Sequence, residues 1–210
     1  MNKKDKSPRK RNAEATQARL LDAAEEQFTE RGFDATRVDD VAEGAGVNKR
    51  MIYVYFGNKE ALYLEVLRRA FQRAMDSAFA SVSTEGDPVQ ITRSIIRWYF
   101  RYLAEHPRFV RLVTWEAMHH GRWSSQAIEP LAGTAMEKLG AVIQAGKEAG
   151  QFRADLDVRH LTVAVHGICL TFFSRRSLLE TLWQEDLSNE AIQHRLLQSI
   201  EDLVFHGIGH

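Results

Sequence analysis

Residues 34–60 constrain the fold most strongly, because two short apolar-periodic segments flank a glycine-containing turn there. The first segment begins after Thr36, and the second runs from Asn48 to about Val54. Between them stands Gly44-Ala45-Gly46, which interrupts the helical periodicity. Two short helices joined by a tight turn of this kind make a helix-turn-helix, whose second helix fits the DNA major groove. We therefore expect the segment that follows Asn48 to read DNA.

The rest of the chain also shows the three- and four-residue apolar spacing of helices, with only four prolines. Hairpin-type clusters of glycine and proline are absent from the sequence, so we predict an all-α fold. Glycine, proline and N-cap residues set the boundaries. The expected helices span about 12–31, 37–45, 48–54, 59–81, 88–106, 107–121, 125–149, 157–179 and 188–206. Residues 1–11 are expected to form a disordered basic arm, 12–58 a three-helix helix-turn-helix domain, and 59–210 a larger helical bundle.

The charge and cysteine content limit the partners and the compartment. The formal net charge is zero, so affinity for nucleic acid must come from local clusters such as the basic residues of 1–11. That arm either contacts DNA or serves as a solubilising tail. The single cysteine, Cys169, excludes an internal disulfide framework and fits a reducing cytoplasm. No segment reaches the ~20 apolar residues of a membrane span, and the basic N-terminus lacks the apolar stretch of a secretory signal. We expect a cytoplasmic protein with no membrane partner.

Between positions 14 and 63, more than a dozen residues follow one specific pattern without a gap. They are Arg19-Leu-Leu-Asp-Ala-Ala24, Phe28, Gly32-Phe33, Thr36, Val38, Val41-Ala42, Ala45-Gly46-Val47, Ile52-Tyr53, Tyr55-Phe56 and Lys59-Glu60-Ala-Leu62. This pattern resembles the DNA-binding domain of the TetR family, the tetracycline-repressor-like bacterial transcription regulators. The remaining two-thirds resemble that family in helical architecture and in the break at residues 149–157. The resemblance implies a homodimer on a double-stranded DNA operator, a ligand pocket among the middle helices and dimerisation through the last two helices.

The residues of the motif suit DNA contacts. Helix N-termini bind phosphate through free N–H groups and a partial positive charge, and phosphate contacts set position rather than sequence. The start of the recognition helix would read base edges, since Arg or Lys can bind the O6 and N7 atoms of guanine. The expected DNA-contacting residues are Thr36, which is also the expected N-cap of the helix over 37–45, Arg37, Asn48, Lys49, Arg50, Met51, Tyr53, Tyr55 and Lys59.

Two positions depart from the family pattern. Arg50 stands where the family usually has glycine, and Val54 stands where it often has an aromatic residue or histidine. The operator preference of relatives therefore does not transfer to this chain. The alternative interpretation is that Lys49 and Arg50 lie on an ordinary solvated face, while Tyr53 and Tyr55 only pack.

The larger domain presents two wide apolar stripes and a group of aromatic residues. The stripes suit a four-helix interface between two subunits, formed by Leu161, Val165, Ile168, Phe172, Ile192, Leu196, Ile200 and Leu203. The aromatic group suits a pocket for a flat or greasy organic molecule, lined by Trp98, Tyr102, Phe109, Trp115, Met118, His119 and Phe172. For both sets the alternative is plain intramolecular core.

Catalytic and metal-binding patterns are not found in the sequence. Glu116 and His119 have the i, i+3 spacing of helical-bundle metal ligands, but such sites need a second copy. We therefore expect no metal, no cofactor and no enzymatic activity. The predicted function is a ligand-responsive, homodimeric DNA-binding regulator, a repressor that binds a palindromic operator and is released by a small apolar or aromatic effector. The alternatives are an effector-independent DNA-binding factor of the same fold and a helical metal protein or enzyme.

Overall fold

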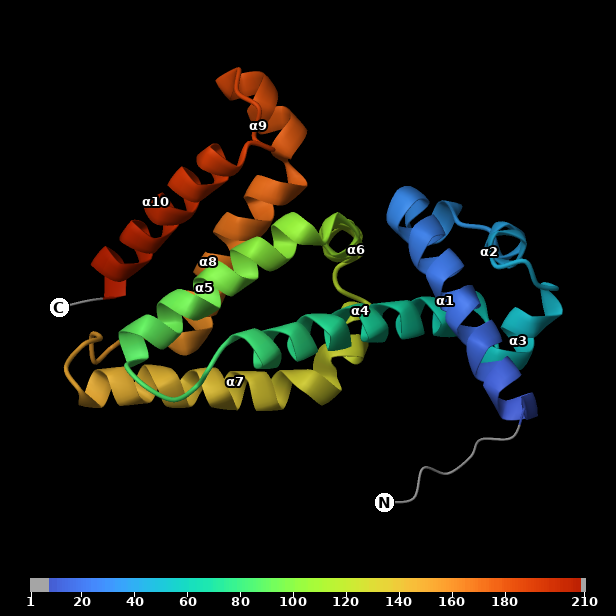
Figure 1. The fold of residues 1–210 in the computed structure, drawn as a ribbon, viewed down its shortest axis with the longest axis horizontal. Coiled ribbons are helices and arrows are strands. Elements are labelled where there is room, and N and C mark those ends of the chain that lie inside the picture. The colour runs from blue at the N-terminus through green and yellow to red at the C-terminus, as the bar shows by residue number, and fades with distance from the viewer. Residues whose placement is uncertain (1–7, 209–210) are drawn as a thin grey trace. The chain divides into compact units, whose positions relative to one another are not determined.

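The computed structural model describes residues 8–208, and every regular element in that range is a helix (Figure 1). The helices are α1 (Pro8–Ala35), α2 (Val38–Gly44), α3 (Arg50–Phe56), α4 (Lys59–Ser81), α5 (Pro88–Glu105), α6 (Pro107–Met118), α7 (Ser124–Glu148), α8 (Val158–Ser174), α9 (Arg176–Trp183) and α10 (Glu190–Ile208). The all-α prediction is confirmed.

Two helix predictions need correction. α1 begins at Pro8, so residues 8–11 are helical rather than part of a disordered arm, and residues 1–7 lie outside the described residues. The single helix expected over 157–179 is two helices, because the path breaks at Arg175, where φ is −111° and ψ is 17°. By contrast, Gly32 interrupts the helical path of α1 as expected, with φ of 74°.

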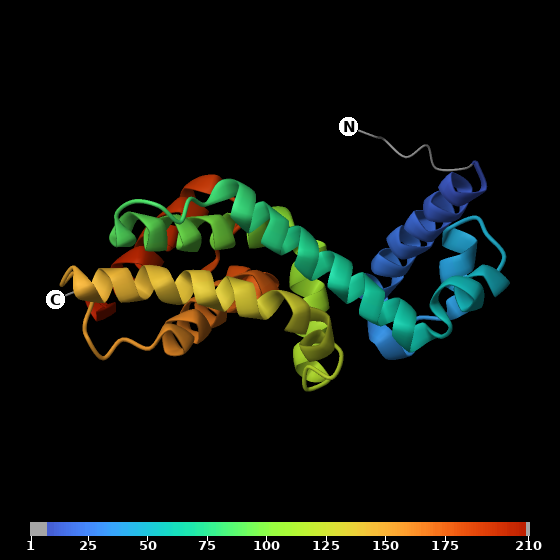
Figure 2. The ribbon, with the colours of Figure 1, turned by 90° about the horizontal axis from the view of Figure 1, so that it is seen from below.

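The chain forms two compact units. The first contains the part up to Phe71 together with Arg111–Ile128, and the second contains Gln72–Val110 and the chain from Glu129 onward. α4 crosses this division as one continuous helix (Figure 2). The expected domain boundary at 58/59 therefore differs from the compact division, which lies inside α4 and adds parts of α6 and α7 to the first unit.

An aromatic cluster holds the added segment in the first unit. Phe33 and Trp123 have ring centroids 4.4 Å apart, and Phe28 and Tyr63 have centroids 4.7 Å apart. Buried Glu116 accepts the backbone N–H groups of Trp123 and Ser124 at 3.1 and 2.7 Å, and so caps the start of α7. Burial, with the nearby Glu116 carboxylate, raises the pKa of Tyr63. The sequence between α6 and α7 thereby becomes part of the core under α1 and α4.

The second unit is built on α5, α8 and α10, which pack against one another. Its core includes Phe100, Cys169, Phe172 and Ile200, each at most 4% exposed. A buried carboxylate also joins α10 to α5, because Glu201 accepts hydrogen bonds from two arginines of α5, Arg93 and Arg97.

Candidate nucleic-acid interface and cavity

The turn between α2 and α3 is closed by local hydrogen bonds. The Val47 N–H donates to the Ala42 carbonyl at 3.0 Å, and Gly46 takes a φ of 61°, in the left-handed region that favours glycine. The Asn48 Oδ1 accepts the backbone N–H of Arg50 at 2.8 Å. These contacts end α2 and fix α3 to begin at Arg50.

The turn and α3 carry six of the nine predicted DNA-contacting residues: Asn48, Lys49, Arg50, Met51, Tyr53 and Tyr55. Fully buried Ile52 ties α3 to the core of the first unit. Met51 and Tyr55 are half-buried, and Tyr55 packs edge-on against Phe56 with ring centroids 6.4 Å apart. The exposed residues at and after the turn are Asn48, Lys49, Arg50, Tyr53 and Val54. The structure thus presents one exposed polar edge, which begins at Asn48.

Thr36 differs from its predicted role. It is only 2% exposed, and its hydroxyl donates toward the carbonyls of Gly32 at 2.7 Å and Gln27 at 3.1 Å. The N-cap of α2 is Arg37, which makes no side-chain cap bond. The hydroxyl of Thr36 therefore stabilises the end of α1 and is not free to cap α2.

Two lysines that are predicted to contact DNA already donate hydrogen bonds within the protein. The Lys49 Nζ donates to Asp39 Oδ2 at 2.9 Å, and this hydrogen bond raises the pKa of Lys49. The Lys59 Nζ donates to the Asp34 carbonyl at 3.2 Å and lies 4.5 Å from the ring centroid of Phe33. These contacts orient both ammonium groups before any ligand arrives.

Arg37 and Arg50 are both exposed, and neither has an ion-pair partner within residues 8–208. Within the described residues, Lys49 is thus the one predicted DNA-contacting cation that forms an ion pair with a carboxylate.

The sequence reasoning missed Asn58. Its Oδ1 accepts the backbone N–H of Ala61 at 2.7 Å, directly before α4. The preceding Gly57, with φ of 85°, turns the chain out of α3. The signal was present, since asparagine is a favoured N-cap residue and Asn58 stands immediately before a Lys-Glu start. The cap leaves the first N–H groups of α4 beside Lys59.

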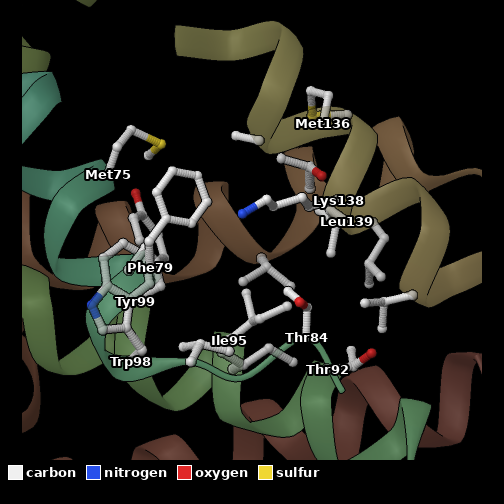
Figure 3. Close-up of a pocket in the computed structure, with 18 of the residues that line it drawn as sticks. Met75, Phe79, Thr84, Thr92, Ile95, Trp98, Tyr99, Met136, Lys138 and Leu139 are labelled. Carbon is white, nitrogen blue, oxygen red and sulfur yellow. The ribbon is translucent and has the colours of Figure 1, made fainter. Parts of the chain in front are cut away.

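The second unit contains a cavity of about 260 Å³ between α4, α5, α7 and α8 (Figure 3). Its walls are almost wholly apolar, with aromatic faces from Phe79, Trp98 and Tyr99. The Trp98 Nε1 donates to Ser77 Oγ at 3.1 Å, which fixes the indole in the wall. Lys138 reaches over the Phe79 ring, with its Nζ 4.2 Å from the centroid.

A tyrosine–histidine pair lies in the same wall. The Tyr99 hydroxyl and His166 Nδ1 are 2.6 Å apart. Burial raises the pKa of Tyr99 and lowers the pKa of His166, so both side chains are neutral near pH 7.

Of the seven residues predicted to line a pocket, only Trp98 lines this cavity. Tyr102 packs beside Trp98, with ring centroids 5.5 Å apart, and Phe109 packs edge-on against Tyr102; neither residue lines the cavity. Phe172 is buried in the core formed with Phe100. The other three predicted residues come from α6 and its end: Trp115 and His119 belong to the first unit, and Met118 is 67% exposed. The predicted set is therefore not one site.

The predicted dimer residues also divide into two groups. Four are buried within the second unit of their own chain and belong to its core: Leu161, Val165, Phe172 and Ile200. Ile192 and Leu196 are half-buried, while Ile168 and Leu203 are exposed, Leu203 by 68%. The outward face of α8 adds exposed Ala164 and Gly167 beside Ile168.

Glu116 and His119 are occupied with other partners. Glu116 caps α7, and His119 lies 3.1 Å from Asp34 Oδ2 and 2.8 Å from the Trp115 carbonyl. Among the described residues, no group of three or more His, Cys, Asp or Glu side chains is arranged to hold a metal ion. None of the helices in that part of the chain combines the length and apolarity needed to span a bilayer.

The two-helix motif with its exposed polar edge, in a chain whose described elements are all helices, defines the class: a helix-turn-helix DNA-binding regulator. Residues 20–66 match the family described as "Bacterial regulatory proteins, tetR family", and residues 88–204 match the "Tetracyclin repressor-like, C-terminal domain". The chain belongs to the TetR family.

Individual relatives agree with this assignment. The chain is similar to the HTH-type transcriptional repressor NicS of Pseudomonas putida, with 31% identity over 203 residues that cover 95% of each protein. It is similar to the HTH-type transcriptional regulator RutR of Escherichia coli at 23% identity over 200 residues, covering 95% of this chain and 93% of RutR. A solved TetR family regulator from Marinobacter aquaeolei VT8 shares the fold, with a TM-score of 0.74 and 19% identity over 96% of this chain and 98% of that one.

Proposed function

We propose that the chain is a homodimeric cytoplasmic repressor that binds a palindromic operator and is released by a small apolar or aromatic effector. The observation that carries this proposal is the path of α4. Lys59, at its first turn, stands beside the DNA-reading motif, and Phe79, near its end, forms a wall of the cavity. A ligand that contacts Phe79 therefore acts on the same helix that carries a DNA-contacting lysine.

Dimerisation is supported by the outward faces of α8 and α10. Gly167 and Ala164 are small enough to let a second helix approach closely, and Ile168 and Leu203 supply exposed apolar surface. A two-fold axis through such a face would present two recognition helices to successive major grooves, about 34–36 Å apart. An operator with matching two-fold symmetry follows from that arrangement.

The cavity supports effector control over the rival interpretation of an effector-independent DNA-binding factor. A fully packed middle bundle would offer no space for a ligand, whereas this bundle contains about 260 Å³ of apolar space. In one conformation of the dimer, the distance between the two recognition helices would not match successive major grooves. An effector that binds this conformation more tightly than the DNA-binding one would weaken operator binding, with a coupling free energy of about 1–3 kcal/mol.

The DNA-contact roles can be tested by fluorescence anisotropy with selected operators and random duplexes across a salt series. Lys59→Ala should weaken binding to all duplexes alike and reduce the salt slope by about 0.9 for each phosphate that the variant no longer neutralises. Arg50→Ala should change the ranking of operators, by about 1–3 kcal/mol at the guanine it contacts. Lys147→Ala, which removes one positive charge from α7 in the second unit, is the matched control and should change neither property. An equal loss on every DNA for Arg50→Ala would refute its base-reading role.

The dimer can be tested by sedimentation velocity and light scattering. Leu203→Glu should shift the protein toward monomer, because it places a charge in the apolar face of α10. Met118→Glu changes a side chain of nearly equal exposure on α6, 67% against 68%, and should leave the mass unchanged. A monomeric wild-type protein, or a dimer unaffected by Leu203→Glu, would rule out this interface.

Effector response can be tested by a thermal-shift screen with apolar organic compounds, followed by operator binding in the presence of each compound that shifts the transition. Stabilisation accompanied by weaker operator binding supports the proposal. Operator binding that no cavity ligand changes favours the effector-independent factor.

A further inference from the structure

The charges around the cavity are one-sided. Lys138 is the only formally charged side chain among the lining residues that the structure describes, and no Asp or Glu is among them. A cationic ligand would enter without a carboxylate to pair with and would face the lysine ammonium. An anionic ligand would instead be attracted by the Lys138 ammonium, because opposite charges attract, and its apolar body would leave water for the apolar walls.

Lys138 is placed to receive an anion. Its Nζ lies 4.2 Å from the Phe79 ring centroid, and Figure 3 shows the nitrogen directed from α7 across the cavity toward that ring. The aromatic face attracts the ammonium but carries no net charge, so the positive charge remains available to a carboxylate. Within the described chain, no Asp or Glu forms an ion pair with Lys138.

The other polar groups of the cavity carry no charge that would oppose an anion. The Thr162 hydroxyl donates to the Val158 carbonyl at 2.7 Å. Thr92, however, is only 2% exposed, and its Oγ1 has no hydrogen-bond partner in the structure. A buried hydroxyl without a partner is costly to the ligand-free protein.

The size of the cavity limits the ligand. If each non-hydrogen atom takes roughly the ~30 Å³ that a water molecule occupies in the liquid, a cavity of 260 Å³ holds on the order of ten such atoms. The lining includes the rings of Phe79, Trp98 and Tyr99, and most of the other lining side chains from α4, α5, α7 and α8 are apolar. A short alkyl chain and a single aromatic ring both fit this description.

We propose that the cavity binds a small monocarboxylate with an apolar body, about ten non-hydrogen atoms in all, whose carboxylate pairs with Lys138. This assignment rests on the proposed effector role and specifies the chemistry of the effector. The carboxylate forms an ion pair with the ammonium group of Lys138, and the apolar body packs against the walls of the cavity. The aliphatic and aromatic forms share this chemistry, and the experiment separates them.

The test is isothermal titration calorimetry on the full-length protein without DNA. The probes are two matched series: octanoate, octan-1-ol and octylammonium, and phenylacetate, 2-phenylethanol and phenethylammonium. At least one acid should bind about ten-fold or more tightly than its alcohol, and the amines should bind most weakly, since a charge-assisted hydrogen bond exceeds a neutral one. The series with the tighter acid identifies the apolar body.

Lys138 variants locate the carboxylate. Lys138→Met should lower the affinity for the acid about ten-fold or more and leave the alcohol unchanged, while Lys138→Arg should retain the preference for the acid. Lys147→Met, on the same helix and outside the cavity lining, is the control and should bind like wild type. Thermal unfolding of each variant verifies that Lys138, which is exposed, is not needed for folding.

The outcomes separate this inference from the proposed function. Equal affinity for acid and alcohol, tighter binding of an amine, no binding of either acid, or an unchanged acid affinity in Lys138→Met would each overturn the monocarboxylate assignment. Acid binding that depends on Lys138 but leaves operator affinity unchanged would support the assignment and contradict the effector role.

Discussion

Two glycines of α7 should respond in opposite directions to the same substitution. Alanine is a better helix former than glycine by about 0.8–1 kcal/mol, so helix propensity alone predicts that either Gly→Ala change stabilises the protein. At Gly146, however, an added Cβ would lie 2.2 and 2.3 Å from two atoms of the Phe152 ring. At Gly140, nothing stands within 4 Å of the same added atom.

The size of the effect follows from these contacts. Carbon atoms in good contact are about 3.5–4.0 Å apart, so the ring must move by more than about 1 Å. Phe152 is 1% exposed and lies in the core of the second unit, which leaves little room for that movement. Overpacking of this kind costs about 1–3 kcal/mol, and the short approach places Gly146→Ala at the upper end. After the propensity gain, we expect a net loss of about 2 kcal/mol for Gly146→Ala and a gain of about 1 kcal/mol for Gly140→Ala.

The measurement is urea and thermal unfolding followed by circular dichroism. The two variants should differ by about 3 kcal/mol, or roughly 6–12 °C in midpoint for a chain of this size. In the Phe152→Ala background the added methyl of Gly146→Ala should cost nothing, because the obstructing ring is gone. If Gly146→Ala proves as stable as Gly140→Ala, the packing argument is wrong.

Three further substitutions test buried or paired polar groups. Glu201→Gln should lower the free energy of unfolding by about 2 kcal/mol, because it removes the charge that two arginines bind. Burial alone would raise the pKa of Glu201, but hydrogen bonds from those arginines outweigh it and lower the pKa. The stabilisation by ionised Glu201 is therefore present above the ordinary pKa of 4.5 and is lost as pH falls through the lower folded pKa. Free energies of unfolding of wild type and Glu201→Gln, measured at pH 7 and below pH 4, check this. Thr92→Val should raise the ligand-free stability by about 1 kcal/mol, because it removes a buried hydroxyl without a partner; a lower melting temperature would contradict that. Hydrogen bonds to the Trp115 carbonyl and then to Asp34 raise the pKa of His119. The contribution of protonated His119 to the free energy of unfolding is therefore present below pH 6.5 and is lost as pH rises through the higher folded pKa. Melting temperatures of His119→Asn and wild type should accordingly differ at pH 5.5 and converge at pH 9.

The helix-turn-helix was predictable because its signals are local. Val41, Ile52 and Gly46 mark two apolar faces and a left-handed turn within a few residues, and the structure has both helices and the turn where the spacing indicates. The role of Thr36 was not predictable in this way. Its residue type suits an N-cap, but only the structure reveals that two carbonyls of α1 take its hydroxyl.

The break between α8 and α9 also escaped the sequence pattern. Apolar residues continue through Arg175 without a glycine or proline, so periodicity predicts one helix. In the structure α9 has no buried residue and Leu178 and Leu182 are more than half exposed, although half-buried Leu179 packs against the core. Hydrophobic periodicity records which residues are apolar, but it does not record where a helix stops packing against its neighbours.

The sequence by itself determined the helical class, the DNA-reading motif and the family, since each depends on residue types at short, fixed spacings. Tertiary structure alone decided the membership of the cavity and of the apolar faces. Four helices line the cavity, with Phe79, Trp98, Lys138 and His166 among their residues, while Trp115 of α6 packs in the other unit. The physical reason is that an apolar side chain gains similar free energy in any dry environment, and only packing geometry selects which one it occupies.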